Sequence, residues 1–387
     1  MYVSRKAEEY FNLIRQQFPV VIVTGPRQSG KTTFVKHQCS DLPYVSLEDP
    51  DIRSMVKDDP KGFLAQYAKG VIIDEFQRVP DLVSYLQAIV DDNKSNGLFI
   101  LTGSQQFMMM ESVSQSLAGR AGLVDLLPFE LGEMTQQGRS IEQDWVTGTY
   151  PRVIVDGQDP KLMYRNYVAT YVERDVRQIT NIRDLSQFER FIELCAGQIG
   201  QIVNASTLAV EVGVSVPTIQ HWLSILEASY LIYFLRPFST NRRKSLVKSP
   251  KLYFVDTGLA SYLLGINDSD IWKTHPLRGN MYENYVISEL WKQTRHAGER
   301  YPFYFYRDHH GKEVDLLMNP YGTHWVACEV KSTSTFNSRL VHQLEWLRHS
   351  GIIPIKDFFL IYQAKQPIVY KETKCINMSD IKSVWAS

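Results

Sequence analysis

Residues 20–33 read VVIVTGPRQSGKTT, an apolar run followed by a loop of the form G-x-x-x-x-G-K-[ST]. In a phosphate-binding loop, backbone N–H groups between a strand and a helix N-terminus surround phosphate oxygens. Gly25 and Gly30 permit the tight turn, Lys31 can reach the β- and γ-phosphates, and Thr32 can ligate Mg²⁺. A glycine-rich turn with an incidental lysine is the weaker alternative. The predicted nucleotide site is Gly25, Pro26, Arg27, Gln28, Ser29, Gly30, Lys31, Thr32 and Thr33.

A second strand downstream ends in two carboxylates, because residues 70–76 read GVIIDEF. Side chains alternate along a strand, so Asp74 and Glu75 point in different directions. Asp74 can hold Mg²⁺ through water, and Glu75 can orient the water that attacks the γ-phosphate. Alone, this motif would indicate an acidic strand end that faces solvent. Together with the phosphate loop, it predicts hydrolysis of a bound nucleotide.

A third apolar run, residues 97–101, leads into Thr102-Gly103-Ser104. Hydroxyl groups at the carboxyl end of a parallel strand beside the phosphate strand can reach the γ-phosphate or the attacking water. Ser104 is the preferred candidate for this contact and Thr102 is the alternative. A plain cap between a strand and a helix explains the same residues equally well.

The composition is that of an ordinary globular protein of 387 residues, 44% hydrophobic and 22% charged. This length allows two or three domains. Lys plus Arg and Asp plus Glu each number 42, so the net charge of zero argues neither for nor against a nucleic-acid partner. The four cysteines are far apart and suit a reduced compartment. Without a recognisable signal sequence or membrane-length apolar run, a cytoplasmic protein is expected.

These motifs resemble those of the AAA+ family of P-loop ATPases, in particular bacterial and archaeal members in which the ATPase module precedes a C-terminal domain of unknown function. The resemblance rests on GPRQSGKTT (25–33), IIDE (72–75), LTGS (101–104), SLAGR (116–120) and LPFELGE (127–133). It implies ATP binding and Mg²⁺-dependent hydrolysis, with Lys31, Thr32, Asp74, Glu75 and Ser104 in the roles argued above. It also implies a homo-oligomer, because AAA-type sites often lie between subunits.

One arginine is expected to sense the phosphate or to be offered to a neighbouring subunit. The resemblance points to Arg120, with Arg152, Arg174 and Arg177 as further candidates. A surface salt bridge explains Arg120 equally well.

The middle of the chain carries a pattern typical of a helix-turn-helix. Within residues 206–222, Ala209 lets two helices approach and Gly213 makes the turn between them. Ile219 and Trp222 anchor the second helix. The apolar face continues toward a strand pair, which suggests a winged form.

The same module leaves nucleic-acid contact open. Its second helix, which begins SVPTIQH at residue 215, has no Arg or Lys where it would enter a groove, and this does not favour base readout. Basic residues follow where a wing is expected, in NRRK (241–244) and at Lys248 and Lys251. Such a wing can hold phosphates without reading sequence. A structural lid or a protein contact is the alternative.

The C-terminal part combines a helix glutamate with acidic and basic strand residues. Glu283 lies near the start of an expected amphipathic helix, and Asp315 lies on a later strand. Glu329 and Lys331, two residues apart on the next strand, share one face. The carboxylates can bind Mg²⁺, and Lys331 can position or activate a water molecule.

This order of residues resembles the restriction-endonuclease-like fold with its PD-(D/E)-x-K site. Val314 stands where the motif has proline, a departure that is common in this superfamily. The resemblance implies a second metal-dependent centre made by Glu283, Asp315, Glu329 and Lys331. Cleavage is a narrower expectation than the fold, because such folds also serve as binding modules.

The complete prediction is an α/β protein of three parts. It comprises a P-loop AAA-type parallel-sheet ATPase domain (1–135), a helical and winged-helix connector (136–245) and a restriction-endonuclease-like α/β domain (246–387). The expected function is ATP hydrolysis with Mg²⁺ that drives or gates action on a macromolecule, with nucleic acid preferred. A nucleotide-dependent switch or interaction protein without cleavage and an ATP-regulated nuclease are the alternatives. ATP, DNA or RNA, a protein and further copies of the chain are the expected partners, and a membrane is not.

Overall fold

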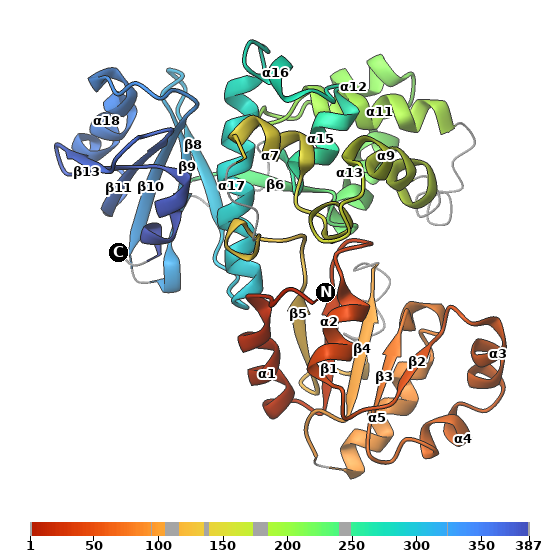
Figure 1. The fold of residues 1–387 in the computed structure, drawn as a ribbon. Coiled ribbons are helices and arrows are strands. Elements are labelled where there is room, and N and C mark those ends of the chain that lie inside the picture. Colours follow the sequence, from red (N-terminus) through yellow and green to blue (C-terminus); the bar gives the residue numbers. More distant parts are fainter. Residues whose placement is uncertain are drawn as a thin grey trace.

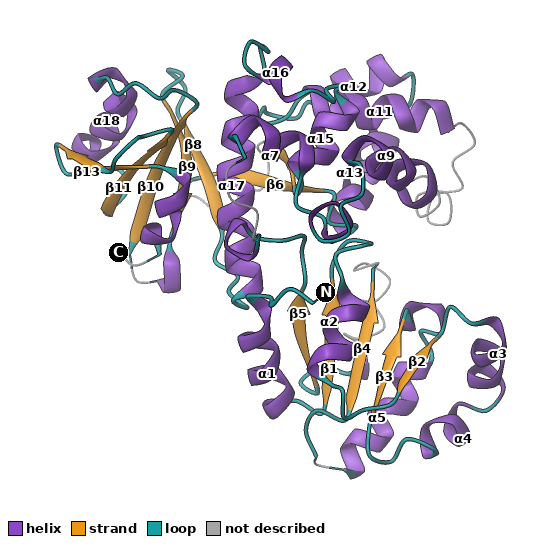
Figure 2. Ribbon diagram, in the orientation of Figure 1, coloured by secondary structure: helices purple, strands orange, loops and turns teal. Residues whose placement is uncertain are grey.

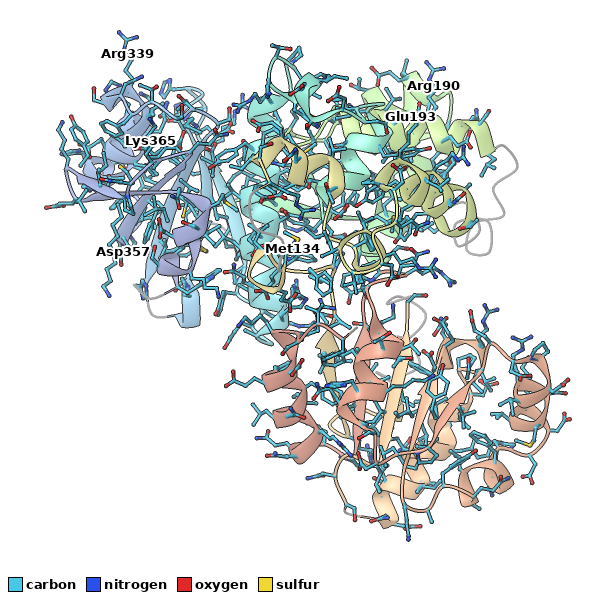
Figure 3. All side chains as sticks on the ribbon, in the orientation of Figure 1. Met134, Arg190, Glu193, Arg339, Asp357 and Lys365 are labelled. Carbon is cyan, nitrogen blue, oxygen red and sulfur yellow. The ribbon has the colours of Figure 1, made fainter. Side chains whose placement is uncertain are left out.

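The computed structural model describes residues 2–93, 95–104, 116–134, 139–172, 185–239, 249–322 and 324–385. An N-terminal sheet, a group of helices and a C-terminal sheet form three units around the long helix α17, Arg278–His296 (Figure 1, Figure 2). Exposed side chains such as Arg190 and Glu193 project outward from the helical unit, and Arg339 projects from the C-terminal unit (Figure 3).

The N-terminal sheet has five parallel strands in the order β2-β3-β4-β1-β5. The strands are β1 Val20–Thr24, β2 Tyr44–Ser46, β3 Val71–Asp74, β4 Phe99–Gly103 and β5 Ala121–Asp125. The central strands β1, β3 and β4 are buried along their whole length, as their unbroken apolar runs require. Alternation along β1 sends Val20 and Ile22 into one hydrophobic cluster and Val21 and Val23 into the other.

Helices cover both faces of this sheet. They are α1 Ala7–Gln17, α2 Lys31–Gln38, α3 Pro50–Asp58, α4 Pro60–Ala65 and α5 Leu82–Asp92. Phe11 of α1 and Phe34 of α2 pack into the cluster that contains Val21. Val56 of α3 and Phe63 of α4 pack into the opposite cluster, together with α5. The first unit is therefore a three-layer α/β/α sandwich.

The middle segment is helical. Its helices are α7 Ile141–Thr147, α8 Pro151–Ile154, α9 Pro160–Tyr167, α11 Leu185–Gly197, α12 Ala205–Val212, α13 Val216–Ala228, α15 Thr257–Leu263 and α16 Ser269–Trp272. A turn joins α12 to α13, and Gly213 adopts the left-handed φ of 80° that ends α12. Ala209, Ile219 and Trp222 are buried between the helices, as the sequence pattern requires.

The C-terminal sheet has eight strands in the order β12-β13-β11-β10-β9-β8-β6-β7. They are β6 Ile232–Pro237, β7 Lys251–Phe254, β8 Phe303–Arg307, β9 Glu313–Met318, β10 Trp325–Lys331, β11 Ile355–Tyr362, β12 Ile368–Tyr370 and β13 Thr373–Ile376. The sheet is mixed, because β10 runs parallel to β11 and antiparallel to β9. Helix α18, His342–Ser350, packs on β9 and β10.

Short helical turns complete the described secondary structure. They are η1 Phe76–Arg78, η2 Leu131–Glu133, η3 Val168–Val172, η4 Pro320–Gly322, η5 Ser338–Val341 and η6 Met378–Val384. Strands β6 and β7 pair with each other across the boundary predicted at 245/246, and β6 also pairs with β8. The class is as predicted at the level of a parallel five-stranded sheet, a helical region and a further sheet. The three domain ranges, the wing and the nuclease-like topology stay predictions.

Helix α17 connects the units. Its 19 residues make a rod about 28 Å long. The helix packs on β7 and β10, and it also contacts β5 and α1 of the N-terminal unit. Residues at its two ends are therefore held at a fixed separation while they contact different units.

Candidate functional site

The phosphate-loop residues join β1 to α2 at the carboxyl end of the parallel sheet. Gly25 has a φ of 149° and Gly30 a φ of 92°. A Cβ on Gly25 would lie 2.1 Å from the carbonyl oxygen of Leu126, so only glycine fits there. The loop and the start of α2 line a cavity of about 430 Å³, a size that suits a small-molecule ligand.

The predicted residues divide into a lining and a buried layer. Those that line the cavity are Arg27, Gln28, Gly30, Lys31, Thr32, Thr33 and Glu75. Those that are buried outside this lining are Gly25, Pro26, Ser29, Asp74 and Ser104. The structure thus brings residues from the loop after β1, from α2 and from the end of β3 to one place.

Lys31 is buried and folds back onto its own loop. Its Nζ donates hydrogen bonds to the carbonyl oxygens of Gly25 at 3.0 Å and Pro26 at 2.8 Å. Phosphate oxygens are stronger partners for an ammonium group than neutral carbonyls are. Lys31 is therefore poised to exchange these bonds for bonds to an anion in the cavity.

Asp74, the last residue of β3, is surrounded by donors. Its Oδ2 accepts hydrogen bonds from Thr32 Oγ1 at 2.8 Å and from the Tyr44 hydroxyl at 2.7 Å. Its Oδ1 accepts from Thr102 Oγ1 and from the backbone N–H of Glu75. The two predicted oxygen ligands for Mg²⁺, Thr32 and Asp74, are thus in direct contact.

Glu75 lines the cavity in an uncommon backbone conformation. Its φ is 55°, in the left-handed region, where a non-glycine residue carries strain that often marks a functional site. Gln77 Nε2 donates to Glu75 Oε2 at 2.5 Å. Burial raises the pKa of the Glu75 carboxyl, against the opposing charges of Lys31 and Arg27. A raised pKa favours a carboxylate that accepts a proton from water.

The two hydroxyl candidates on β4 and after it differ in their partners. Thr102 is bonded to Asp74, whereas the buried Oγ of Ser104 has no partner in the described part of the chain. A buried hydroxyl without a hydrogen-bond partner costs about 1–3 kcal/mol of folding free energy. The hydroxyl of Ser104 could recover this cost by a hydrogen bond to a bound group. The role predicted for Ser104 stays a prediction.

Arg120 does not reach the phosphate loop of its own chain. Its carbonyl oxygen accepts from the N–H of Val20 at the start of β1, whereas the loop follows the end of that strand. Its guanidinium pairs with Asp91 instead, with Nε to Oδ1 at 2.5 Å and Nη2 to Oδ2 at 2.9 Å. The expectation of in-chain phosphate sensing is corrected on this point, because the motif did not reveal at which end of β5 the arginine lies. A role toward a neighbouring subunit stays a prediction.

Arg152 is the alternative arginine that lines the cavity. It follows Pro151, whose Cγ would lie 3.7 Å from a Cβ on Gly30. The middle segment therefore closes directly over the phosphate loop. The other two candidates, Arg174 and Arg177, lie outside the described residues.

Three residues at this site had no sequence signal. Tyr44 and Gln77 bind the two carboxylates, and Arg5 Nη1 donates to the Ser29 carbonyl oxygen at 3.1 Å. Tyr44 starts a three-residue strand, and Arg5 precedes α1 without a motif. The contacts of Tyr44 and Arg5 depend on the strand order and chain path, which no local pattern encodes, whereas Gln77 lies only two residues after its partner Glu75.

The C-terminal residues predicted as a second centre also come together. Lys331 Nζ lies 3.1 Å from Asp315 Oδ2 and 2.5 Å from Glu329 Oε1. Antiparallel pairing of β9 with β10 puts Cys328 opposite Leu316, so Asp315 and Glu329 are the next positions along the ladder. Glu329 is buried, and its Oε2 has no partner in the described part of the chain.

Glu283, on α17, is linked to this group by charge and by Lys251. Burial and the charge of Asp315 raise the pKa of Glu283 to about 7, against Lys251. Burial and Asp315 likewise raise the pKa of Glu329 to about 8, against Lys331. In both cases burial and the repulsion from Asp315 outweigh the attraction of the nearby ammonium group.

Lys251 was expected on a basic wing but is buried in this centre. Its Nζ lies 3.0 Å from Glu283 Oε1 and 2.6 Å from Glu313 Oε1. The wing expectation is therefore wrong for Lys251, because β7 turns this side chain toward α17. The remaining wing residues, 241–244 and Lys248, lie outside the described residues.

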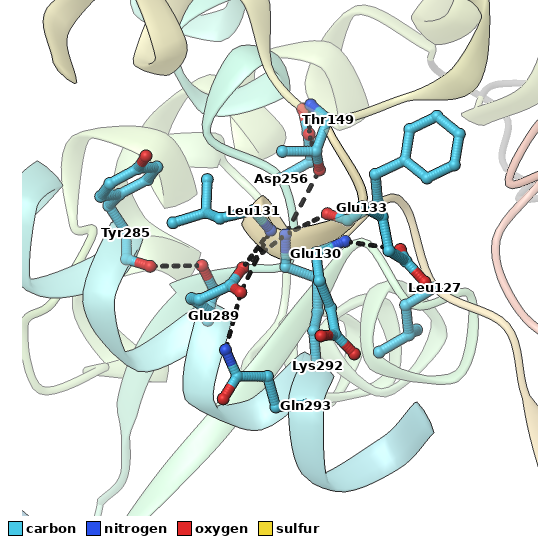
Figure 4. Close-up of polar contacts among 12 residues, drawn as sticks. Leu127, Glu130, Leu131, Glu133, Thr149, Asp256, Tyr285, Glu289, Lys292 and Gln293 are labelled. Carbon is cyan, nitrogen blue, oxygen red and sulfur yellow. Dashed lines mark hydrogen bonds and ion pairs between the residues drawn. The ribbon is translucent and has the colours of Figure 1, made fainter. Parts of the chain in front are cut away.

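A polar network joins the end of α17 to the segment after β5 (Figure 4). Glu289 accepts from the N–H of Leu131, and Lys292 Nζ donates to the carbonyl oxygen of Phe129 at 2.9 Å. His296 Nε2 accepts from the N–H of Leu127 at 3.0 Å, so its Nδ1–H donates to Glu130 at 2.7 Å.

The same network reaches the phosphate loop through Arg5. Its guanidinium contacts Glu133, the Leu127 carbonyl oxygen and the Ser29 carbonyl oxygen. The acidic oxygens of Glu130 and Glu133 and a ring nitrogen of His296 lie within 4.8 Å of one another. Their bonds to Arg5, to one another and to backbone N–H groups explain this grouping without a metal.

Three family sequence models match consecutive parts of the chain. Residues 17–135 match an AAA domain, residues 138–270 match the domain of unknown function DUF8612, and residues 278–381 match the domain of unknown function DUF4143. An uncharacterized protein of Mycobacterium tuberculosis is 29% identical over 324 residues, which cover 82% of this chain and 71% of that protein. An uncharacterized protein of Haemophilus influenzae is 23% identical over 306 residues, which cover 70% of this chain and 74% of that protein.

Solved structures share weaker similarity. The Walker-type ATPase PABY2304 of Pyrococcus abyssi matches with a TM-score of 0.45 and 13% identity, over 67% of this chain and 94% of that one. The RuvB Holliday junction branch migration motor of Thermotoga maritima matches with a TM-score of 0.30 and 16% identity, over 60% and 89%. None of the helices in the described ranges has the length and apolar character needed to cross a bilayer. The N-terminal unit is thus an AAA-type P-loop ATPase domain, followed by DUF8612 and DUF4143 segments.

Proposed function

We propose that the AAA domain binds ATP at the phosphate loop and hydrolyses it with Mg²⁺. The observation that carries this proposal is the direct contact between Thr32 and Asp74 beside the cavity that Lys31 and Glu75 line. Hydroxyl and carboxylate oxygens are the ligands that Mg²⁺ prefers, so the residues present fit the ion. When bound, Mg²⁺ would neutralise phosphate charge.

The remaining steps are assigned to side chains and backbone N–H groups of the chain. Lys31 exchanges its two carbonyl partners for phosphate oxygens, and the N–H groups of the loop hold the others. Glu75, held by Gln77, orients the attacking water and receives its proton. Arg152 contributes positive charge from the middle segment, which makes closure of that segment part of the site.

The test is release of inorganic phosphate from ATP by the full chain, with and without Mg²⁺. Lys31→Met is expected to remove ATP binding and turnover together, because it deletes the only side-chain ammonium group among the described lining residues. Lys57→Met changes an exposed lysine of α3 in the same way and serves as the control. Normal turnover by Lys31→Met would contradict the proposal.

Hydrolysis is proposed to drive or gate action on a macromolecular partner. The support is helix α17, which contacts both the segment after β5 and the C-terminal centre. A conformational change at the phosphate loop can therefore be transmitted through α17 to the C-terminal unit. Nucleic acid is the preferred partner, and a nucleotide-dependent protein switch is the alternative. Stimulation of ATP turnover by DNA or RNA supports the former, and its absence with slow turnover supports the latter. Homo-oligomerisation and a cytoplasmic location stay proposals.

A second candidate function is Mg²⁺-dependent cleavage of a phosphodiester in the C-terminal unit. Its support is the meeting of Asp315, Glu329 and Lys331, together with the buried Glu329 Oε2 that lacks a described partner. Such an oxygen suits a divalent cation, and Glu283 extends the carboxylate set. The bound cation would activate water and stabilise the leaving oxygen.

The test is incubation of the full chain with single- and double-stranded DNA and RNA in Mg²⁺ or Mn²⁺. Asp315→Asn is expected to abolish cutting. Asp270→Asn, a change at an exposed position, is expected to leave it unchanged. Cutting that persists in Asp315→Asn would come from another site or a contaminant and would contradict this function.

A further inference from the structure

Strand β7 directs two donors at the same oxygen of Glu283. Lys251 Nζ lies 3.0 Å from Oε1, and the hydroxyl of Tyr253 donates to Oε1 at 2.5 Å. Residues two apart on a strand share a face, so both side chains reach α17 from one side. In the described part of the chain, these contacts of Glu283 are made by Oε1, which leaves Oε2 for a ligand.

The donors are themselves held firmly. The Tyr253 ring stacks on Tyr233 with ring centroids 5.5 Å apart, and Tyr233 stacks on Trp291 of α17 at 4.7 Å. Lys251 is buried and also pairs with Glu313 of β9 at 2.6 Å. The phenol and the ammonium group therefore tie β7, α17 and β9 together around one carboxylate.

We propose that Tyr253 and Lys251 are positioning residues of the C-terminal centre, which orient Glu283 so that its second oxygen binds a divalent cation. The inference rests on the second candidate function. Both residues belong to the segment 138–270, whereas Glu283, Asp315 and Glu329 belong to the segment 278–381. The cation site is thus shared between the two segments and is complete only when both are present.

The decisive probe is Mn²⁺ itself, titrated calorimetrically into the full chain in an Asp74→Asn background, which removes the carboxylate proposed to bind the metal at the nucleotide site. Tyr253→Phe deletes the donor and nothing else, and is expected to weaken Mn²⁺ binding about 10-fold or more, as loss of an outer partner does at other metal sites. Tyr233→Phe is the matched control. It removes a hydroxyl from the same stack, and that hydroxyl has no partner among the described residues.

A double-mutant cycle separates positioning from general destabilisation. Glu283→Gln is expected to weaken Mn²⁺ binding, and Tyr253→Phe added to it should cost no further affinity, because the phenol acts through Glu283. Equal Mn²⁺ affinity for Tyr253→Phe and its parent, or additive losses in the cycle, would overturn the inference. If the parent binds no Mn²⁺, and Asp315→Asn does not change the cutting of nucleic acid, the second candidate function itself fails. The inference then fails with it.

Discussion

The hydroxyl of Thr32 donates a 2.8 Å hydrogen bond to Oδ2 of Asp74, which joins the first turn of α2 to the end of β3. These residues come from segments that meet only because β3 and β1 both flank β4 in the sheet. The contact places a hydroxyl and a carboxylate beside the anion-binding loop. It is the structural basis for expecting a Mg²⁺–ATP site.

Asp74→Asn is expected to lower ATP turnover about 100-fold and to remove the effect of Mg²⁺ on ATP affinity. The amide is nearly isosteric with the carboxylate but carries no charge to attract the ion. The expected drop in turnover therefore comes from weaker Mg²⁺ binding and not from a changed shape of the site. ATP affinity measured with and without Mg²⁺ checks this. Asp81→Asn, at an exposed residue without a side-chain cap bond, is the control. Retention of the Mg²⁺ effect in Asp74→Asn would refute the assignment.

Arg152→Ala and Arg120→Ala are expected to differ. Arg152 lines the cavity, so its removal should lower turnover about 10-fold or more through lost stabilisation of phosphate charge. Arg120 pairs with Asp91 on the surface, and Arg120→Ala should leave turnover at low protein concentration unchanged. Turnover across a range of protein concentrations checks both. A loss confined to high concentration in Arg120→Ala would assign Arg120 to a neighbouring subunit's site.

Glu133 provides a pH-dependent contribution to stability. Burial acts to raise the pKa of its carboxyl, but Arg5, His296 and backbone N–H groups outweigh burial, so the pKa lies below the ordinary value. A depressed carboxyl pKa stabilises the fold above the unfolded-state value of about 4.3, and this contribution is lost as pH falls through the folded-state pKa.

Glu133→Gln is therefore expected to destabilise the protein at pH 7, by about 3 kcal/mol for a broken buried pair, and by progressively less as pH falls below about 4.3. Melting temperatures across that range provide the measurement. Glu211→Gln, an exposed change of the same kind, should show no such trend. If Glu133→Gln lowered the melting temperature equally at every pH, the charge of Glu133 would not be what stabilises the segment after β5.

The arrangement of the candidate nucleotide site could be expected from the sequence because its main residues are contiguous in the chain. The spacing of Gly25, Gly30, Lys31 and Thr32 encodes the loop, and each acidic or hydroxyl partner directly follows an apolar strand. Tyr44 and Arg5 could not be found in this way, because their contacts depend on strand order and on the path of the N-terminus.

The C-terminal centre shows the same division. The helix and strands were expected from local periodicity, and the set Glu283, Asp315, Glu329 and Lys331 was expected from a resemblance in the order of residues. Lys251 was read as part of an exposed basic run, since charge in sequence does not tell which face of a strand meets a helix. The in-chain phosphate contact expected of Arg120 was wrong for a related reason, because a motif does not show at which end of the sheet a residue lies, whereas its role toward a neighbouring subunit stays a prediction.

The central claim, hydrolysis of ATP with Glu75 as the group that activates water, is tested most directly by Glu75→Gln. ATP binding and phosphate release are measured on the same preparation of the 387-residue chain, with Glu211→Gln as the control. The expected result is ATP affinity close to wild type and turnover reduced about 100-fold or more, because the amide cannot accept the proton. Wild-type turnover by Glu75→Gln would contradict the account.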